Sequence, residues 1–385
     1  MKDVFIIGSK GIPANYGGFE TFVDNLVSRK KDKEIKYHVA CMTLKKQTKE
    51  YEYHGASCQQ ITVPNIGGAK AVVYDLKALN WALKTIKEKN IRNGIIYILA
   101  CRVGPFLHYY VEKFHNYGFK IWVNPDGHEW KRAKWAFMIR KYWKASEKLM
   151  IKNSDFIICD SKTIEKYIHQ EYQKYNPKTK FIAYGADVTQ SSLTETDKTV
   201  KKWFEKNKVI LNTYFLIVGR FVPENNFEVM IREFMSSDIR NDLIIVTNVE
   251  KNKFYERLKQ RTHFERDSRI KFVGTVYDQQ LLKFIREHAL AYIHGHSVGG
   301  TNPSLLEALA STKLNLLYNV GFNKEVGGDG ALYWSKENGS LVKLLNLTVS
   351  LHREKIEDKH VLSKKIILNS YSWEKIIDRY EKCMR

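Results

Sequence analysis

The sequence opens with a glycine-rich loop whose backbone could hold an anion. The loop GSKGIPANYGGFE contains four glycines, Gly8, Gly11, Gly17 and Gly18. It separates an apolar run at 4–7, which predicts a buried strand, from an amphipathic stretch at 19–26, which predicts a helix. Glycines let backbone N–H groups approach an anion at the positive end of the helix dipole. The spacing fits neither GxGxxG nor a Walker loop, so a turn that needs glycine only for its geometry is an equal alternative.

A second candidate anion site lies in HGHSVGGTNPSLLEAL. Here Gly299, Gly300, Thr301 and Asn302 precede a helix that Pro303 would open. Two adjacent glycines followed by Asn and Pro at a helix start are typical of a nest of backbone N–H groups. A simple turn is the weaker alternative.

The stretch WVNPDGHEWKR offers a carboxylate for proton transfer. Asp126 follows a buried strand and a proline, where it could orient or deprotonate a hydroxyl group. An Asx turn with Gly127 is an equal alternative on local sequence. His128, Glu129 and Lys131 are near enough to share this site. The histidines show no metal-ligand spacing, so we expect no bound metal and read His128, His294 and His296 as polar residues of the site.

These loops follow strands of two α/β domains. In the first half of the chain, short β-branched runs predict strands: VFIIG, YHVAC, GIIYILA, FKIWVN, FIICD and KFIAYG. They alternate with stretches of 3.6-residue apolar periodicity, such as 72–86, which predict helices. After a polar stretch at 188–200 the pattern restarts with YFLIVGR, DLIIVTN, IKFVGT, LAYIHG and KLNLLYN, and helices are expected at about 224–235, 251–260, 279–288 and 303–311. We expect a domain at 1–190, a second at 191–370, and a segment at 371–385 that crosses back to the first. Two doubly wound domains would bind ligands at the carboxyl ends of their strands, in the cleft between them.

Composition narrows the classes of partner. The 385 residues include 63 Lys and Arg against 42 Asp and Glu, and the net charge of +21 indicates an anionic partner. The five cysteines are scattered and never in CxxC spacing, which fits a reducing cytoplasm. We expect neither a signal peptide nor a membrane span, so any contact with a membrane would be peripheral.

Three stretches together resemble one family of enzymes. The opening loop, NPDG and VGGTNPSLLEAL are similar to the bacterial dTDP-rhamnose-dependent rhamnosyltransferases of streptococcal-type surface polysaccharide synthesis, and the similarity continues to YSWEKI at 371–376. The resemblance implies a GT-B glycosyltransferase: two facing Rossmann-like domains, the first for the acceptor and the second for the nucleotide-sugar, without a metal or other cofactor. The implied donor is dTDP-rhamnose. The implied acceptor is glucose or N-acetylglucosamine on a polyprenyl diphosphate.

The resemblance also implies a set of donor residues. Without a metal, cations and backbone N–H groups must stabilise the leaving diphosphate, and Arg220 at the end of VGR could do so. The alternatives for Arg220 are a strand-end cap or an ion pair with Glu224. Related enzymes place a lysine where GRFVPENN has Asn225 and Asn226. Glu307 matches a glutamate that binds the ribose, and Gly299 stands where retaining members carry a second glutamate. The donor set is Arg220, Glu224, Asn225, Gly299, Gly300, Thr301, Asn302 and Glu307.

On the acceptor side, the resemblance favours Asp126 and Lys131 as catalytic residues beside Arg220. The acceptor-binding set is Gly17, Gly18, Glu20, His128 and Glu129. A β-linked product from a β-linked donor would mean net retention, with the leaving phosphate helping to deprotonate the incoming hydroxyl group.

The stretch KRAKWAFMIRKYWKASEKLMIK at 131–152 interleaves basic and aromatic residues on an expected helix. Such a helix suits an anionic bilayer, and a core-facing helix with a basic outer side is an equal alternative. A lipid-linked acceptor would place the protein in the cytoplasm, peripherally associated with the inner face of the plasma membrane. Two other functions remain open: a GT-B sugar-nucleotide epimerase, and a basic nucleic-acid-binding protein, which lacks support from any helix-turn-helix, zinc-finger or RNP-type signature.

Overall fold

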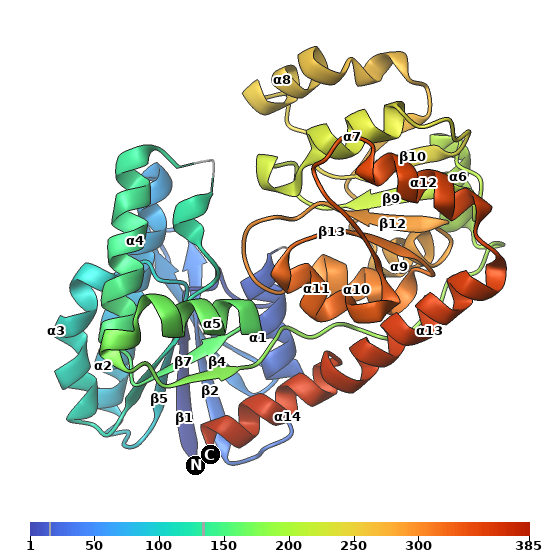
Figure 1. Ribbon diagram of the computed structural model, residues 1–385. Helices are drawn as coiled ribbons and strands as arrows, with labels where there is room; N and C mark the ends of the chain where they lie inside the picture. Colours follow the sequence, from blue (N-terminus) through green and yellow to red (C-terminus); the bar gives the residue numbers. More distant parts are fainter. Residues whose placement is uncertain (15–16, 133–134) are drawn as a thin grey trace. The chain divides into compact units, whose positions relative to one another are not determined.

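The computed structural model describes residues 1–14, 17–132 and 135–385. The chain divides into two compact units (Figure 1). Unit 1 consists of Met1–Gly185 together with Trp373–Arg385, and unit 2 of Ala186–Ser372. The first observed boundary therefore lies a few residues before the expected limit at 190, and the chain returns to unit 1 just after the expected limit at 370.

Unit 1 is built on an eight-stranded sheet in the order β3-β4-β2-β1-β5-β6-β7-β8, parallel except for the β3–β4 pair. Its central strands are continuous apolar runs because helices cover both of their faces. The strands are β1 (Lys2–Ile7), β2 (Ile35–Thr43), β3 (Glu50–Tyr53), β4 (Ala56–Thr62), β5 (Ile95–Leu99), β6 (Lys120–Asn124), β7 (Phe156–Cys159) and β8 (Thr179–Phe181).

Helices α2 and α3 pack on one face of this sheet, and α1 and α14 pack on the other. On the second face, the rings of Phe22 and Tyr97 meet Tyr380 of α14, and the Tyr97 and Tyr380 hydroxyls lie 3.1 Å apart. The last helix is thus part of the core of unit 1. The helices are α1 (Gly18–Ser28), α2 (Lys70–Glu88), α3 (Gly104–His115), α4 (Phe137–Lys152), α5 (Lys162–Glu171) and α14 (Trp373–Met384).

Unit 2 has a six-stranded parallel sheet in the order β11-β10-β9-β12-β13-β14. Helices α7, α8 and α12 cover one face, and α6, α9 and α10 cover the other. The strands are β9 (Tyr214–Val218), β10 (Asp242–Val246), β11 (Ile270–Gly274), β12 (Ala291–His294), β13 (Asn315–Tyr318) and β14 (Leu332–Trp334). The helices are α6 (Lys198–Asn207), α7 (Phe227–Met235), α8 (Lys253–Thr262), α9 (Gln279–Glu287), α10 (Pro303–Ser311), α11 (Gly321–Gly327), α12 (Ser340–Ser350) and α13 (Arg353–Ser370).

Two local expectations need correction. The helix expected over 131–152 begins only at Phe137, because a short 3-10 turn at Glu129–Lys131 and an extended Arg132 precede it. Lys134 of that stretch, like Asn15 and Tyr16 of the opening loop, lies outside the described residues. The polar linker is also shorter than expected, since α6 already begins at Lys198.

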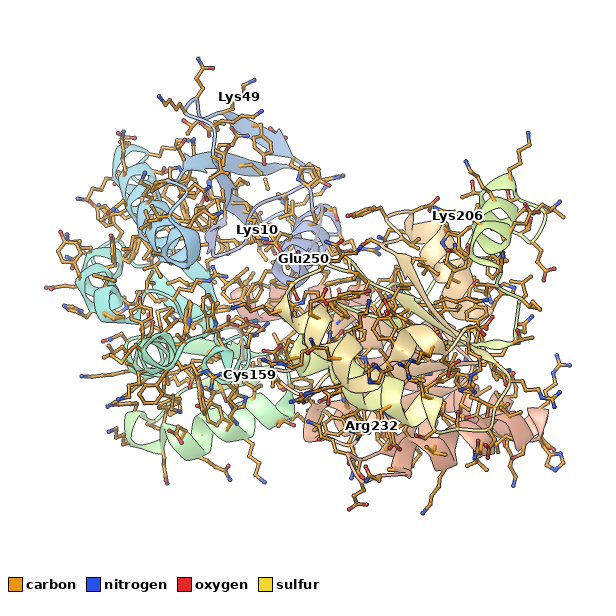
Figure 2. The ribbon with its side chains drawn as sticks, turned by 90° about the horizontal axis from the view of Figure 1, so that it is seen from above. Lys10, Lys49, Cys159, Lys206, Arg232 and Glu250 are labelled. Carbon is orange, nitrogen blue, oxygen red and sulfur yellow. The ribbon has the colours of Figure 1, made fainter. Side chains whose placement is uncertain are left out.

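Basic side chains are exposed on both units. Lys49 of unit 1 and Lys206 of α6 are exposed, whereas Cys159 is buried, as are Cys41, Cys58 and Cys101 (Figure 2). Among the residues that the structure describes, no helix is long and apolar enough to cross a membrane.

Candidate functional site

In unit 1 the first residues of the opening loop, 8–10, are held by several hydrogen bonds. Gly8 has φ +105°, and a Cβ atom there would lie 2.2 Å from the Leu99 carbonyl oxygen, so only glycine fits. The Arg102 guanidinium donates to the Gly8 carbonyl at 2.8 Å, and the Tyr74 hydroxyl donates to the Ser9 carbonyl at 2.8 Å. The Met42 amide donates to the Lys10 carbonyl at 2.8 Å. Residues 8–10 are therefore held in place at the carboxyl end of β1.

Glu20 has an internal role in this loop. Its carboxylate accepts from the Lys10 amide at 2.7 Å, and the side chain is buried. A Cβ atom on Gly17 would lie 1.9 Å from the Glu20 Oε2 atom, so Gly17 admits this carboxylate. By contrast, nothing lies within 4 Å of the position that a Cβ atom on Gly18 would take. Of these three predicted acceptor residues, Gly18 leaves open space and Glu20 fastens the loop to α1.

Asp126 lies in the loop after β6. Its amide donates to the Asn124 Oδ1 atom at 2.9 Å, so Asn124 closes the turn. The Asp126 backbone is left-handed, with φ +54°, a conformation that a non-glycine residue adopts at an energetic cost. Its carboxylate is half-buried and lies 3.6 Å from the Arg132 guanidinium. Arg132, which sequence reasoning did not single out, therefore holds a positive charge beside the candidate base.

The neighbours of Asp126 are fixed by other partners. The Glu129 carboxylate pairs with Arg132 at 2.5 Å and accepts from the Trp135 indole at 2.8 Å. The His128 ring lies 4.3 Å from the Tyr167 ring, and burial together with Lys131 and Lys144 lowers the pKa of His128 to about 4. His128 is thus neutral at physiological pH, with one ring nitrogen that can donate a hydrogen bond and one that can accept. Lys131 is exposed, with its ammonium group 5.0 Å from the centre of the Trp130 ring.

Arg102 is a further residue that sequence reasoning missed. It follows β5 directly, donates to Gly8, and lies 3.3 Å from the buried Asp75 carboxylate. Burial raises the pKa of Asp75 to about 6, although Arg102 opposes the shift. The rule that identified the other loops, polar residues just after a strand, applies equally to Arg102 in GIIYILACR. Arg102 positions the glycine loop and brings a guanidinium to the carboxyl edge of the sheet.

In unit 2 the loop after β9 is linked to the loop after β12. Asn225 donates its side-chain amide to the Arg220 carbonyl at 2.7 Å, and its Oδ1 atom lies 2.9 Å from the His296 Nδ1 atom. Because a backbone carbonyl only accepts, the Asn225 oxygen must face His296, so His296 Nδ1 carries the proton. The Glu224 carbonyl accepts from the Ser297 amide at 3.0 Å. Arg220 itself is exposed, at the start of the loop that these bonds hold.

The predicted nest precedes α10. Gly299 has φ +129°, and a Cβ atom there would lie 3.3 Å from the His296 Nε2 atom, so His296 occupies the space beside the glycine. Thr301 is buried. Asn302 is the N-cap of α10, and its side chain accepts from the Ser304 and Leu305 amides at 2.9 and 3.3 Å. The Asn302 side chain therefore serves the helix, and the backbone from Gly299 to Thr301 is what this loop can offer to an anion.

Glu307 lies one turn into α10 and pairs with a buried arginine. Its Oε2 atom is 2.7 Å from the Arg286 guanidinium, which also donates to Ser304 Oγ at 3.2 Å. The Arg286 side chain is 3% exposed and that of Glu307 is 33% exposed, so the carboxylate is partly accessible while its partner is not. The ion pair with Arg286 fixes the position of one oxygen of the Glu307 carboxylate. Sequence reasoning did not identify Arg286, which is far from Glu307 along the chain.

His294 is connected to the Arg286–Glu307 pair through Tyr292 and Ser304. The Tyr292 hydroxyl donates to the Val218 carbonyl at 3.0 Å and lies 3.3 Å from both His294 Nδ1 and Ser304 Oγ. Burial lowers the pKa of His294 to about 3, and its Nε2 atom has no hydrogen-bond partner within the described part of the chain. His294 is a neutral, buried support for the loop that carries His296.

Together, the exposed Arg220, the loop at 299–302 and the Glu307 carboxylate follow strands β9 and β12 of the unit 2 sheet, a set that suits a phosphorylated ligand with hydroxyl groups. Unit 1 presents the Asp126 carboxylate beside Arg132, and Arg102 lies after β5 of the same sheet. Within residues 1–14, 17–132 and 135–385, no three His, Cys, Asp or Glu side chains gather as metal ligands.

Two family models match separate parts of the chain. Residues 1–187 match the family described as "Domain of unknown function (DUF1972)", and residues 196–365 match "Glycosyl transferases group 1". An uncharacterized glycosyltransferase of Methanocaldococcus jannaschii is 26% identical over 255 residues, which cover 63% of this chain and 61% of that relative.

Among solved structures, sucrose-phosphate synthase of Thermosynechococcus elongatus superimposes with a TM-score of 0.80 at 14% identity, covering 100% of this chain and 98% of that one. Trehalose 6-phosphate synthase of Burkholderia multivorans gives 0.76 at 11% identity, covering 100% and 96%. HepE of Anabaena, solved in complex with UDP, gives 0.70 at 14% identity, covering 100% and 99%.

The fold is therefore GT-B, with two Rossmann-like domains. The family match of residues 196–365 supports a glycosyltransferase of group 1. That segment contains every predicted donor residue.

Proposed function

We propose that this protein is a rhamnosyltransferase that moves L-rhamnose from dTDP-rhamnose to glucose or N-acetylglucosamine on a polyprenyl diphosphate, during synthesis of a cell-surface polysaccharide. The class of reaction draws support from the group 1 match of residues 196–365 and from the GT-B fold. The rhamnosyl donor and the lipid-linked acceptor draw support from the resemblance of NPDG and VGGTNPSLLEAL to the streptococcal enzymes. Neither the epimerase nor the nucleic-acid alternative gains support from the comparisons.

One observation carries the donor side of the proposal. The loop that bears Arg220 and the loop that bears Gly299 are joined through the Asn225–His296 hydrogen bond. Such a linkage holds the Arg220 backbone close to the Gly299 loop, so that the exposed Arg220 side chain and backbone N–H groups can reach the same diphosphate. Glu307, held by Arg286, accepts hydrogen bonds from sugar hydroxyl groups of the nucleotide.

The chemical step exchanges one bond at the anomeric carbon. The bond from that carbon to the diphosphate oxygen breaks, and a bond to the acceptor oxygen forms. Arg220 stabilises the negative charge that grows on the leaving diphosphate. Asp126, with Lys131 nearby, orients the acceptor hydroxyl group, and its proton passes to Asp126 or to the leaving phosphate. Net retention follows if the rhamnosyl linkage of the product is β, and no metal takes part.

The acceptor places the enzyme at a membrane. A polyprenyl diphosphate remains in the bilayer, so the protein works from the cytoplasm against the anionic inner face of the plasma membrane. The charge of +21 supports this assignment.

A turnover assay tests the proposal. Purified protein is incubated with dTDP-rhamnose and water-soluble, short-chain lipid diphosphates that carry glucose or N-acetylglucosamine, and products are analysed by mass spectrometry. We expect one deoxyhexose to be added to one acceptor. UDP-glucose and UDP-N-acetylglucosamine serve as competing donors.

Two variants assign the residues. Arg220→Ala and Asp126→Ala should each lower kcat at least about a hundredfold with folding kept. Transfer of glucose in place of rhamnose would refute the donor assignment alone. Failure of every nucleotide-sugar to react or to raise the melting temperature would refute the glycosyltransferase assignment.

A further inference from the structure

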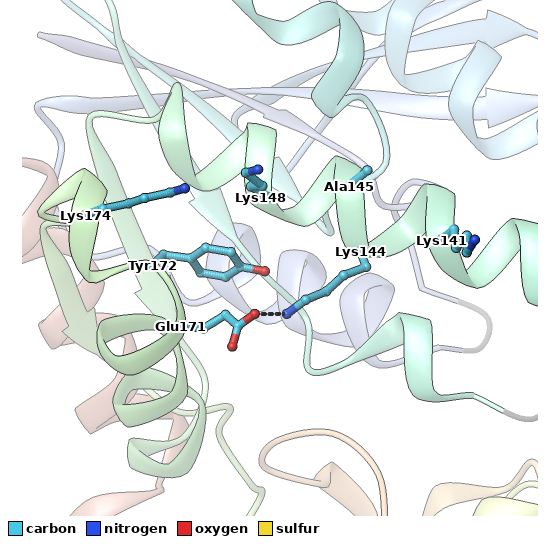
Figure 3. Close-up of a pocket in the computed structure, with 7 residues that line it drawn as sticks. All are labelled: Lys141, Lys144, Ala145, Lys148, Glu171, Tyr172 and Lys174. Atoms are coloured by element: carbon cyan, nitrogen blue, oxygen red, sulfur yellow. Dashed lines mark ion pairs between the residues drawn. The ribbon is translucent and has the colours of Figure 1, made fainter.

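A pocket lined by lysines lies on unit 1, and none of its lining residues is assigned to catalysis. Its volume is about 400 Å³, and α4 and the end of α5 form its walls (Figure 3). It is lined by Lys141, Lys144, Ala145, Lys148, Glu171, Tyr172 and Lys174. Four of the seven lining residues are lysines and one is a glutamate, so the pocket is strongly positive.

One lysine is part of the wall. The Lys144 ammonium lies 2.8 Å from Glu171 and 3.7 Å from the buried Glu147, and the Tyr172 hydroxyl also donates to Glu147. In Figure 3 Lys144 extends to Glu171 beside the Tyr172 ring. These contacts compensate the charge of Lys144 with nearby carboxylates and fix the shape of the pocket.

The other three lysines supply its net charge. Lys141, Lys148 and Lys174 are exposed, and among the described residues none of the three ammonium groups lies within ion-pair distance of a carboxylate. Lysine is a point charge that suits a phosphate oxygen. The pocket therefore has the charge and the volume for a phosphate group.

An exposed apolar turn adjoins the pocket. The helix α4 begins with Phe137, Met138 and Ile139, whose exposed fractions are 68%, 71% and 42%. The Lys141 ammonium lies 4.6 Å from the centre of the Phe137 ring. Positions 137, 141, 144 and 148 are spaced three or four residues apart, so they share one face of the helix. Three consecutive exposed apolar side chains beside lysines are typical of a surface that inserts among lipid headgroups. A nucleic acid would leave these apolar side chains exposed to water, so lipid is the better partner.

We propose that the lysine pocket binds the phosphate headgroup of an anionic phospholipid while the apolar turn at 137–139 inserts at the level of the headgroups. This inference rests on the proposed function, because it specifies how the enzyme would meet the membrane that carries its acceptor. An anionic phospholipid bilayer satisfies both features of this surface, because its phosphate binds the lysines and its apolar layer accepts the turn at 137–139.

Vesicle flotation of the full chain tests the inference. The vesicles are phosphatidylcholine alone, or phosphatidylcholine and phosphatidylglycerol in equal parts. The pocket variant is Lys141→Ala/Lys148→Ala/Lys174→Ala, and the charge-matched control is Lys198→Ala/Lys201→Ala/Lys202→Ala on the exposed side of α6. We expect binding to the anionic vesicles only, a loss of roughly a hundredfold in affinity for the pocket variant, and a loss below about fivefold for the control. Phe137→Ser/Met138→Ser should weaken binding at least about tenfold.

Turnover with the water-soluble acceptors separates this inference from the proposed function, since the pocket variant should keep wild-type turnover there. Equal losses of vesicle binding in the pocket and control variants would overturn the inference, because only net charge would then matter. Binding of inorganic phosphate or a short RNA at the pocket, with no preference for anionic vesicles, would also overturn it.

Discussion

At the scale of single residues, the candidate donor site depends on a side chain that bridges two loops. Asn225 connects the Arg220 carbonyl to His296 Nδ1 across 71 positions of sequence. Sequence reasoning placed Asn225 in the donor set but could not identify this partner, since nothing in local sequence encodes a contact across such a separation. It also missed Arg286, whose importance follows only from its burial against Glu307.

The Asn225–His296 bond predicts coupled kinetic effects. Asn225→Ala and His296→Ala should each lower kcat/KM by roughly ten- to a hundredfold, because either change frees the Arg220 loop. The double variant should be no worse than the worse single variant. Asn241→Ala is the matched control, since Asn241 donates to the Thr213 carbonyl at 2.7 Å at the other end of β9. Additive losses in steady-state kinetics would contradict the coupling.

His294 predicts acid sensitivity of unit 2. Its folded pKa of about 3 lies below the ordinary value, so the unfolded chain takes up a proton first as the pH falls below about 6.5. Stability is therefore lost toward acid, by about 2 kcal/mol between pH 6.5 and pH 5. In urea unfolding, His294→Gln should reduce the difference between pH 7 and pH 5 by that amount, and the exposed control His352→Gln should not. If the pH dependence of stability were unchanged in His294→Gln, His294 would not be the source of the acid sensitivity.

At the scale of elements, strands were easier to predict than helices. The buried strands are short apolar runs that can be recognised directly in the sequence, as in VFIIG and YFLIVGR. The long helix α13 was not predicted, because it has no continuous apolar stripe: only Ser363 and Ile367 are buried. It packs through small residues, and a Cβ atom on Gly330 would lie 2.5 Å from the Ser363 amide nitrogen. The β3–β4 hairpin was likewise missed, since its outer strand is largely polar.

The contact between α3 and α4 predicts a stability effect. The Gly104 amide donates to Ser146 Oγ at 2.8 Å, and a Cβ atom on Gly104 would lie 2.2 Å from the Ser146 carbonyl oxygen. Gly104→Ala should destabilise unit 1 by about 1–3 kcal/mol, because backbone must move. Gly18→Ala, at a position with open space, should change stability by less than about 1 kcal/mol. Urea unfolding measures both, and equal effects would contradict the packing argument.

At the scale of the whole molecule, the chain consists of two α/β units, and each carries part of the proposed chemistry. The repeated order of strand, polar loop and helix predicted this fold and most of the loops that bear the candidate residues. The sequence could not tell which side chains in those loops bind backbone groups of the protein and which are left for a ligand. Glu20 and Asn302 were expected at a ligand, but Glu20 accepts from a backbone amide of the opening loop and Asn302 accepts from backbone amides of the first turn of α10. The same carboxylate or amide chemistry suits a ligand or a backbone N–H group, so only three-dimensional context separates the two roles.

The central claim is that unit 2 holds the nucleotide diphosphate through Arg220, whereas unit 1 serves the acceptor. Titration calorimetry of dTDP into the wild type, Arg220→Ala and Asp126→Ala tests it most directly. We predict binding by the wild type, affinity reduced at least about tenfold in Arg220→Ala, and wild-type affinity in Asp126→Ala. Unchanged binding in Arg220→Ala together with a loss in Asp126→Ala would contradict the account.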